Sequence, residues 1–239
     1  MGKQRNASKP TRADKVEENF KAAPPLEPKN KIQTHYINLI NGSPITFATG
    51  YPGTSKTYIP TRIASLWLKQ KAIQKIILLR PAVSASKSVG YAKGTHEEKM
   101  KHWLRPILKP LREEFSFGQL RDLMKEEVQR IDFCPLENVK GNSWDNAFVI
   151  VDEAEDCTLE EIIALTTRIG KNTTLVICGD VAQSDLTHSG LGQFLDMRKQ
   201  SKHLTEATSH IDFDELNFIV RSDICRKVVT GLCEIGFYK

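Results

Sequence analysis

Short apolar runs alternate with longer amphipathic stretches along most of the chain. Four runs are apolar at nearly every position: Ile45–Thr49, Ile76–Leu79, Ala147–Val151 and Thr174–Cys178. Such runs are typical of strands buried on both faces of a parallel sheet. Three longer stretches have the apolar spacing of helices: Tyr58–Lys71, Glu97–Phe115 and Leu159–Arg168. Strands alternating with helices predict an α/β domain, with a mostly parallel sheet flanked by helices.

Residues 1–27 do not share this pattern. They are polar, end in "KAAPPLEP" and show no periodicity, so we expect a flexible, basic N-terminal tail. The remaining residues, 28–239, are expected to form a single domain, since their number suits one hydrophobic core.

Composition narrows the class of protein. Hydrophobic residues make up 40% and charged residues 26% of the chain, which is ordinary for a soluble globular protein. No apolar run approaches the roughly 20 residues that cross a bilayer, and the first 20 residues contain no apolar leader. The five cysteines are an odd number without a C-x-x-C pair, which argues for reduced thiols in the cytoplasm and against a zinc site.

The stretch "TFATGYPGTSKTYIP" from Thr46 to Pro60 nearly matches the nucleotide-binding pattern G-x-x-x-x-G-K-[ST]. It lies between a predicted strand and a predicted helix, so backbone N–H groups and a helix N-terminus can surround a phosphate chain. Lys56 would then reach the β- and γ-phosphates, and the Thr57 hydroxyl would bind Mg²⁺. The candidate phosphate-binding residues are Gly50, Tyr51, Pro52, Gly53, Thr54, Ser55, Lys56 and Thr57. The alternative is a glycine-rich turn without a ligand.

Ser55 stands where the pattern has its second glycine. A Cβ at this position crowds the phosphate or the required backbone angle, at a cost on the order of 1 kcal/mol. Because serine is small and its hydroxyl can donate to a phosphate, we expect weakened rather than lost binding.

Two further predicted strands end in polar residues. "NAFVIVDEAED" places Asp152 and Glu153 at the end of a neighbouring buried strand, where Asp152 would hold Mg²⁺ through water and Glu153 would polarise the attacking water. "LVICGDVAQSD" places Gln183 after another strand, where it would sense the γ-phosphate or orient water. The alternatives are a solvated strand end and an exposed loop glutamine.

With these strand ends assembled, the sequence resembles the PhoH family of P-loop ATPases, relatives of the motor core of superfamily-one helicases with a RecA-like fold. The resemblance covers roughly residues 28 to 235. It rests on the phosphate-binding loop and three further segments: "LLRPAVSASKSVGYAKGTHEEKMKHWLRPI", "KGNSWDNAFVIVDEAEDCT" and "LTTRIGKNTTLVICGDVAQSDL".

The resemblance implies further roles. "NKIQTHYINLI" is similar to the family's segment before the loop, which puts Gln33 on adenine with Tyr36 nearby for stacking, and implies ATP rather than GTP. "LNFIVRSDICRKVV" is similar to a late motif whose arginine contacts the γ-phosphate, here Arg221; the alternative is a surface residue at a helix start. Glu155 stands where the family usually has glutamine, and its charge is expected to slow hydrolysis unless it points away.

A helicase-type motor uses two such lobes, whereas this chain has room for one. Arg221 therefore acts on its own site or on that of a neighbouring subunit. The second arrangement predicts a ring-shaped homo-oligomer, such as a hexamer, with ATP between the subunits.

The stretch from Lys69 to Arg112 is rich in basic residues, and the whole chain carries a net charge of +5. Arg80, Lys87 and Lys93 can follow a phosphate backbone while Tyr91 stacks on a base. This predicts single-stranded RNA or DNA as a partner, and the family resemblance favours RNA. The alternative is a solvated helix face.

Together these features predict Mg-dependent binding and hydrolysis of ATP, coupled to single-stranded nucleic acid. Two other classes stay open at this point. One is a P-loop kinase, and the other is a nucleotide-binding scaffold in which Ser55 and Glu155 have abolished turnover.

Overall fold

The computed structural model describes residues 20–81, 107–139 and 143–238. Six strands form one sheet in the order β3–β2–β4–β5–β1–β6, and every adjacent pair is parallel. The strands are β1 (Ile45–Gly50), β2 (Lys75–Arg80), β3 (Ile131–Pro135), β4 (Ala147–Val151), β5 (Thr174–Cys178) and β6 (Ser209–Phe213). The predicted α/β class with a parallel sheet is confirmed.

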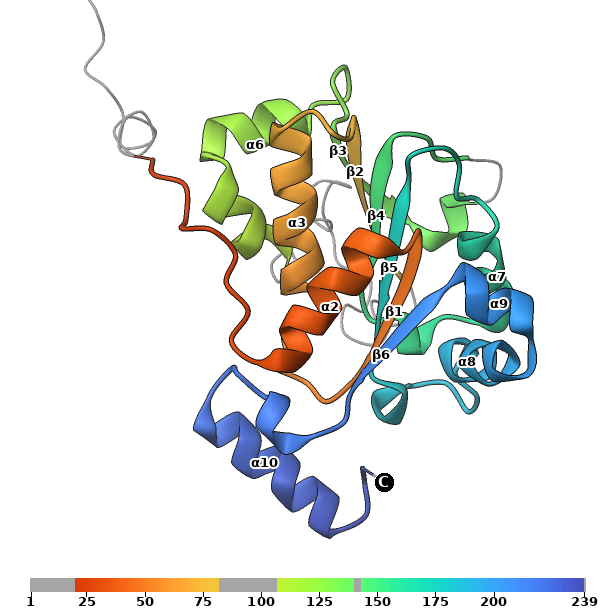
Figure 1. The fold of residues 1–239 in the computed structure, drawn as a ribbon. Helices are drawn as coiled ribbons and strands as arrows, with labels where there is room; N and C mark the ends of the chain where they lie inside the picture. The colour runs from red at the N-terminus through yellow and green to blue at the C-terminus, as the bar shows by residue number, and fades with distance from the viewer. Residues whose placement is uncertain (1–19, 82–106, 140–142, 239) are drawn as a thin grey trace, which may run out of the picture.

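Helices cover both faces of this sheet (Figure 1). The labelled helices are α2 (Lys31–Gly42), α3 (Tyr58–Lys69), α6 (Phe117–Leu123), α7 (Leu159–Thr166), α8 (Gly190–Gln200), α9 (Lys202–Ala207) and α10 (Asp223–Glu234). Residues 107–114 are also helical. Helices α2, α3 and α6 lie on one face, α7 and α8 lie on the other, and α10 lies beyond the edge where β1 and β6 end.

Two buried cores explain why the strands read as continuous apolar runs. Along β4, Phe148 and Ile150 point into the core beneath α3, whereas Val149 and Val151 point into the core beneath α7 and α8. Successive side chains of a strand alternate between faces, so a strand covered on both sides needs an apolar residue at every position.

The order of the strands in the sheet differs from the order that the sequence predicts. Strand β4, which carries Asp152 at its end, does not neighbour β1, because β5 pairs with both of them. The prediction of a neighbouring strand is therefore wrong. Because all six strands run parallel, their carboxyl ends still meet at one edge, where open α/β sheets bind ligands.

The segment from Phe20 to Pro28 packs on the domain rather than extending from it. The Ala23 N–H donates to the Glu113 carbonyl at 2.7 Å, and Arg62 Nη2 donates to the Pro24 carbonyl at 2.8 Å. Leu26 packs against the core on the α3 face. The predicted tail is thus wrong for these residues, and residues 1–19 lie outside the described ranges. Within the described ranges, no helix is both long and apolar enough to span a membrane.

Candidate nucleotide-binding site

The loop between β1 and α3 has the backbone of a phosphate cradle. Gly50 has φ 104° and Gly53 has φ 78°, angles that glycine adopts without steric cost. A Cβ on Gly50 would lie 2.5 Å from the carbonyl carbon of Phe213 in β6, so the loop fits against that strand only with glycine there.

Ser55 shares the left-handed conformation, with φ 77°. This is the backbone angle for which the pattern reserves its second glycine, so the predicted source of the Ser55 penalty is present. A non-glycine residue held at such an angle costs on the order of 1 kcal/mol or more.

Lys56 is folded into the loop that precedes it. Its Nζ donates to the carbonyl oxygens of Gly50 at 2.5 Å and Tyr51 at 2.7 Å. Burial lowers the pKa of Lys56 below its usual value, although Asp180 opposes this effect. A buried cation whose surroundings only partly compensate its charge favours an anionic ligand beside it.

Thr57 and Asp152 are in direct contact. Thr57 Oγ1 donates to Asp152 Oδ1 at 2.6 Å, and Asp152 is only 9% exposed. Burial raises the pKa of Asp152, while the bond from Thr57 and the charge of Arg80 oppose the rise. A hydroxyl and a carboxylate oxygen this close can hold one Mg²⁺, either directly or through its waters. The donor set therefore fits the ion that the sequence predicts.

Glu153 is held by Arg80, a residue predicted to contact nucleic acid. Arg80 Nε donates to Glu153 Oε2 at 2.6 Å, and Arg80 Nη2 forms an ion pair with Glu153 Oε1. Glu153 has φ 55° and ψ 41°, a left-handed conformation that turns the chain directly after Asp152. Arg80 thus holds the candidate base in this structure, and its predicted contact with nucleic acid stays a prediction. The other predicted nucleic-acid residues, Lys87, Tyr91 and Lys93, lie outside the described ranges.

Gln183 lies at the end of the short turn Val181–Gln183 after β5 and lines the same pocket as Lys56. Its Nε2 donates to Asp180 Oδ2 and to Tyr238 Oη, each at 2.7 Å. Sequence reasoning missed Tyr238, because a single tyrosine 58 residues from Asp180 gives no local signal of this contact.

Arg221 lies beside the phosphate loop of its own chain. The Val220 N–H donates to the Gly53 carbonyl at 3.0 Å, and a Cβ on Gly53 would lie 2.9 Å from Arg221 Cβ. The exposed Arg221 side chain lines the same pocket as Lys56. Arg221 therefore borders the pocket of its own chain, and the ring in which it acts on a neighbouring subunit stays a prediction.

Gln33 and Tyr36 both bond to the backbone of the phosphate loop. Gln33 Nε2 donates to the Thr54 carbonyl at 3.2 Å, and its Oε1 accepts the Lys29 N–H at 2.8 Å. Tyr36 is fully buried, and its Oη donates to the Lys56 carbonyl at 2.9 Å. The Tyr36 ring is fully buried, so the stacking prediction is wrong, whereas the predicted contact of Gln33 with adenine stays a prediction.

Glu155 does not point away from the site. Its Oε2 accepts the Asp180 N–H at 3.0 Å, and the residue lines the pocket with only 8% of its surface exposed. Burial raises the pKa of Glu155 to about 7. The shift favours the protonated carboxyl group near neutral pH, and in that form it resembles glutamine.

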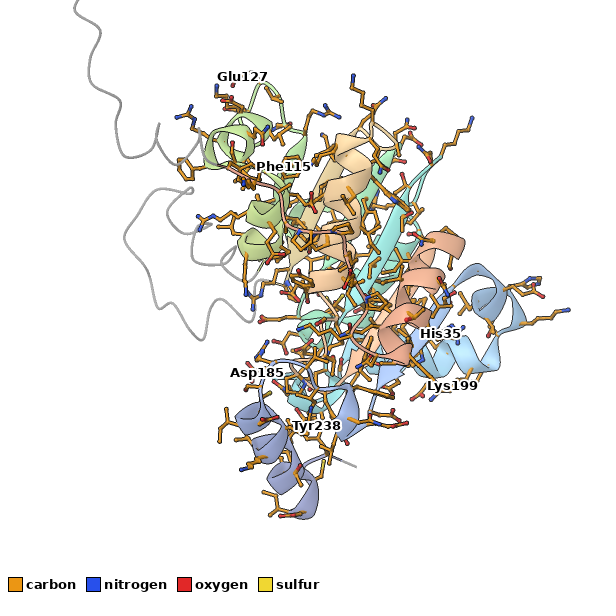
Figure 2. The ribbon with its side chains drawn as sticks, turned by 60° about the vertical axis from the view of Figure 1, so that its left-hand side comes forward. His35, Phe115, Glu127, Asp185, Lys199 and Tyr238 are labelled. Atoms are coloured by element: carbon orange, nitrogen blue, oxygen red, sulfur yellow. The ribbon has the colours of Figure 1, made fainter. Side chains whose placement is uncertain are left out.

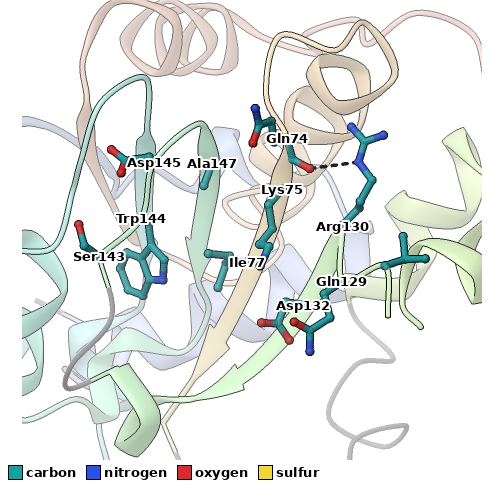
Figure 3. A pocket seen from close by; sticks show the side chains of 11 residues that line it. Gln74, Lys75, Ile77, Gln129, Arg130, Asp132, Ser143, Trp144, Asp145 and Ala147 are labelled. Carbon is teal, nitrogen blue, oxygen red and sulfur yellow. Dashed lines mark hydrogen bonds between the residues drawn. The ribbon is translucent and has the colours of Figure 1, made fainter. Parts of the chain in front are cut away.

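These groups surround a cavity of about 320 Å³. A larger cavity of about 780 Å³ lies at the opposite edge of the sheet, beside the amino ends of β2 and β4 (Figure 3). There Arg130 Nε donates to the Gln74 carbonyl, and Asp145 accepts the Lys171 N–H. These bonds hold turns together, and the groups of the predicted site lie at the other edge.

The parallel sheet, the loop from Gly50 to Thr57 and the Thr57–Asp152 contact define a P-loop protein of the α/β class. The family model described as "PhoH-like protein" matches residues 25–232. The chain therefore belongs to the PhoH-like family, which suggests a nucleotide-binding protein of the P-loop ATPase type.

Several curated relatives share this region. The chain is 29% identical to "Protein PhoH" of Escherichia coli K12 over 88% of its own length and 56% of the relative's. It is 34% identical to a "PhoH-like protein" of Mycobacterium tuberculosis H37Rv, over 77% and 53% of the two lengths. For a "PhoH-like protein" of Bacillus subtilis the identity is 32%, over 82% and 60%. The chain thus spans little more than half the length of these relatives.

Proposed function

We propose that the chain binds Mg-ATP in the loop from Gly50 to Thr57 and hydrolyses it. The observation that carries the proposal is the joint position of three side chains. Lys56 lies inside the loop, and Thr57 contacts Asp152 across β5. Packing alone gives no reason to place a partly buried lysine and a buried carboxylate at this edge, whereas a Mg-bound triphosphate needs both.

In the proposed reaction Mg²⁺ neutralises phosphate charge and orients the triphosphate when it is bound. Lys56 would exchange its two carbonyl partners for β- and γ-phosphate oxygens. Glu153 would accept the proton of the attacking water, and Arg221, already beside Gly53, would stabilise charge on the γ-phosphate. An arginine in that role contributes about 10³–10⁵ in rate.

The choice of ATP over GTP is supported by family membership, and the contact of Gln33 with adenine is part of this proposal; the buried Tyr36 does not support it. Coupling to single-stranded nucleic acid, with RNA favoured, is supported by the basic composition of residues 82–106. A homo-oligomeric ring stays a proposal, and Arg221 at the pocket of its own chain is the residue that such a ring would share between subunits. Cytoplasmic location is likewise proposed, from the cysteine pattern.

A second candidate function is a nucleotide-binding scaffold with little turnover. Three observations favour it: the left-handed Ser55, the Arg80–Glu153 pair that occupies the candidate base, and the carboxyl group of Glu155 in the pocket. A kinase is not supported, because the described part of the pocket is lined by groups that suit hydrolysis.

Phosphate release from the purified chain tests these alternatives. We expect Mg-dependent release that is lost in Lys56→Ala and rises when single-stranded RNA is added. Nucleotide binding without release would favour the scaffold, and release only in the presence of a phosphate acceptor would favour a kinase. Absence of both binding and release would overturn the proposal.

A further inference from the structure

Gln183, Asp180 and Tyr238 form a closed set of hydrogen bonds at the rim of the site. Gln183 Nε2 donates to Asp180 Oδ2 and to Tyr238 Oη, each at 2.7 Å. Tyr238 Oη donates to the same Asp180 oxygen at 2.8 Å. Asp180 is itself fixed, since its Oδ1 accepts the Ala182 N–H at 3.2 Å.

These hydrogen bonds determine which end of the Gln183 amide faces Asp180 and Tyr238. A carboxylate can only accept hydrogen bonds, so the Gln183 group that faces Asp180 must be the NH₂. Asp180 and Tyr238 both accept from this NH₂ group. The remaining polar atom is Oε1, an acceptor, for which no bonding partner is found in the described part of the chain.

Packing holds the Tyr238 hydroxyl in place. Tyr238 is only 6% exposed, and its ring lies edge-on against Tyr51 of the phosphate loop, with centroids 4.7 Å apart. Ile219 and Val229 complete this small core beneath α10. Figure 2 shows Tyr238 beside α10, at the edge of the domain near Asp185. The segment after α10 is therefore tied to the loop and to Gln183 through one residue.

We propose that Tyr238 is a positioning residue that, together with Asp180, fixes Gln183 so that its Oε1 accepts a hydrogen bond from the attacking water. The inference rests on the proposed hydrolysis of ATP at this site. The NH₂ end of Gln183 is held toward Asp180 and Tyr238, so the end that stays available is the acceptor Oε1, which suits a water O–H. Of the two roles that the sequence leaves open, this favours orienting water.

In the step concerned, the water oxygen forms a bond to the γ-phosphorus while the bond to the β–γ bridging oxygen breaks. ADP leaves with that electron pair, and the water proton passes to a carboxylate, for which Glu153 is the candidate. Gln183 Oε1 takes no proton and only directs the water.

The test compares two complexes of Mg-ADP. Aluminium fluoride imitates the transition state with its attacking water, and beryllium fluoride imitates the bound γ-phosphate. We expect Tyr238→Phe and Gln183→Ala each to weaken the aluminium fluoride complex about tenfold, with the beryllium fluoride complex unchanged within about twofold. The double variant should bind no more weakly than Gln183→Ala, and kcat should fall in Tyr238→Phe while KM stays constant.

Thr230→Ala removes a hydroxyl from α10 that donates to the Arg226 carbonyl, and as a matched control it should alter neither complex. If Tyr238→Phe does not fold, Gln183→Ala alone, at an exposed position, decides whether the two complexes respond differently. Equal weakening of both complexes, or no effect of either variant, would overturn the inference while the unmodified chain still binds both. If the unmodified chain binds neither complex, the proposed function fails first and the inference fails with it.

Discussion

Ser55 has a side chain at a backbone angle that the phosphate loop reserves for glycine. Its φ of 77° lies close to the 78° of Gly53 two residues earlier. The loop therefore keeps the conformation of the pattern although one of its residues departs from it. Strain at such a position is held by the surrounding structure, here by the contacts of the loop with β6 and Gln33.

Comparing Ser55→Gly with Ser55→Ala isolates this strain, since both variants lack the hydroxyl and only alanine keeps the Cβ. We expect Ser55→Gly to be more stable than Ser55→Ala by about 1 kcal/mol in urea unfolding, because glycine relieves the left-handed angle. Equal stabilities, or a more stable alanine variant, would show that the angle costs nothing.

Glu155 makes stability depend on pH. Burial, together with the charges of Asp152 and Asp156, raises its pKa from the usual 4.5 to about 7. The folded protein therefore binds this proton more tightly than the unfolded chain, so the free energy of unfolding falls as pH rises from about 4.5 to about 7. Above pH 7 the full cost of the buried carboxylate is present.

Glu155→Gln should remove that cost while its carbonyl still accepts the Asp180 N–H. We expect the variant to gain stability over the unmodified chain at pH 8, on the order of 3 kcal/mol, and to show little gain at pH 5. Urea unfolding at the two pH values measures the difference, with Glu160→Gln on the exposed side of α7 as control. A gain of the same size at both pH values would contradict the assignment.

At the scale of elements, a buried ion cluster joins α3 to the helix at residues 107–114. Arg62 pairs with Glu113 and Glu114 at 2.8 Å each, and Lys69 pairs with Glu114 at 3.0 Å. Tyr58, the first residue of α3, donates to Glu113 at 2.6 Å. The cluster thereby fixes the start of the helix that follows Thr57.

Arg62→Leu should cost about 3–5 kcal/mol of stability, because it leaves the buried Glu114 without its main partner. Replacing both Arg62 and Glu114 with leucine should cost much less. Lys69→Ala, at a more exposed position, should cost under about 1 kcal/mol. Chemical denaturation of the unmodified chain and the three variants measures these differences in the free energy of unfolding. A double variant as unstable as Arg62→Leu would mean that the buried charge is not the cause.

The central strands could be predicted from the sequence, and the edge strands could not. β4 and β5 have the predicted bounds, Ala147–Val151 and Thr174–Cys178, since burial on both faces makes them continuously apolar. β6 reads "SHIDF" and β3 reads "IDFCP", with polar residues between apolar ones, and neither has a continuous run. A search for continuous apolar runs therefore does not detect such strands.

The residues of the site also fall into those that the sequence predicts and those that it does not. Lys56, Thr57 and Asp152 belong to local patterns, and the structure brings them together. The bond from Gln33 to the loop, the Arg80–Glu153 pair and the Tyr238 contact join segments far apart in the chain. These contacts depend on the strand order and on packing, and a local sequence pattern predicts neither.

At the scale of the whole molecule, the sheet, its two cores and α10 bring one set of groups to a single edge. Residues from the ends of β1, β4 and β5 line the pocket together with Arg221, which precedes α10. Tyr238, which follows α10, bonds to Gln183 in that lining. Our central proposal is that the loop binds a triphosphate whose Mg²⁺ lies between Thr57 and Asp152.

Calorimetric titration with a non-hydrolysable ATP analogue, with and without Mg²⁺, tests this claim most directly. In the unmodified chain we expect binding that weakens at least about tenfold when Mg²⁺ is removed, since the ion links the phosphates to two protein groups. In the double variant Thr57→Val, Asp152→Asn, affinity should be low and independent of Mg²⁺. Absence of binding to the unmodified chain, or an undiminished Mg²⁺ dependence in the double variant, would contradict the account.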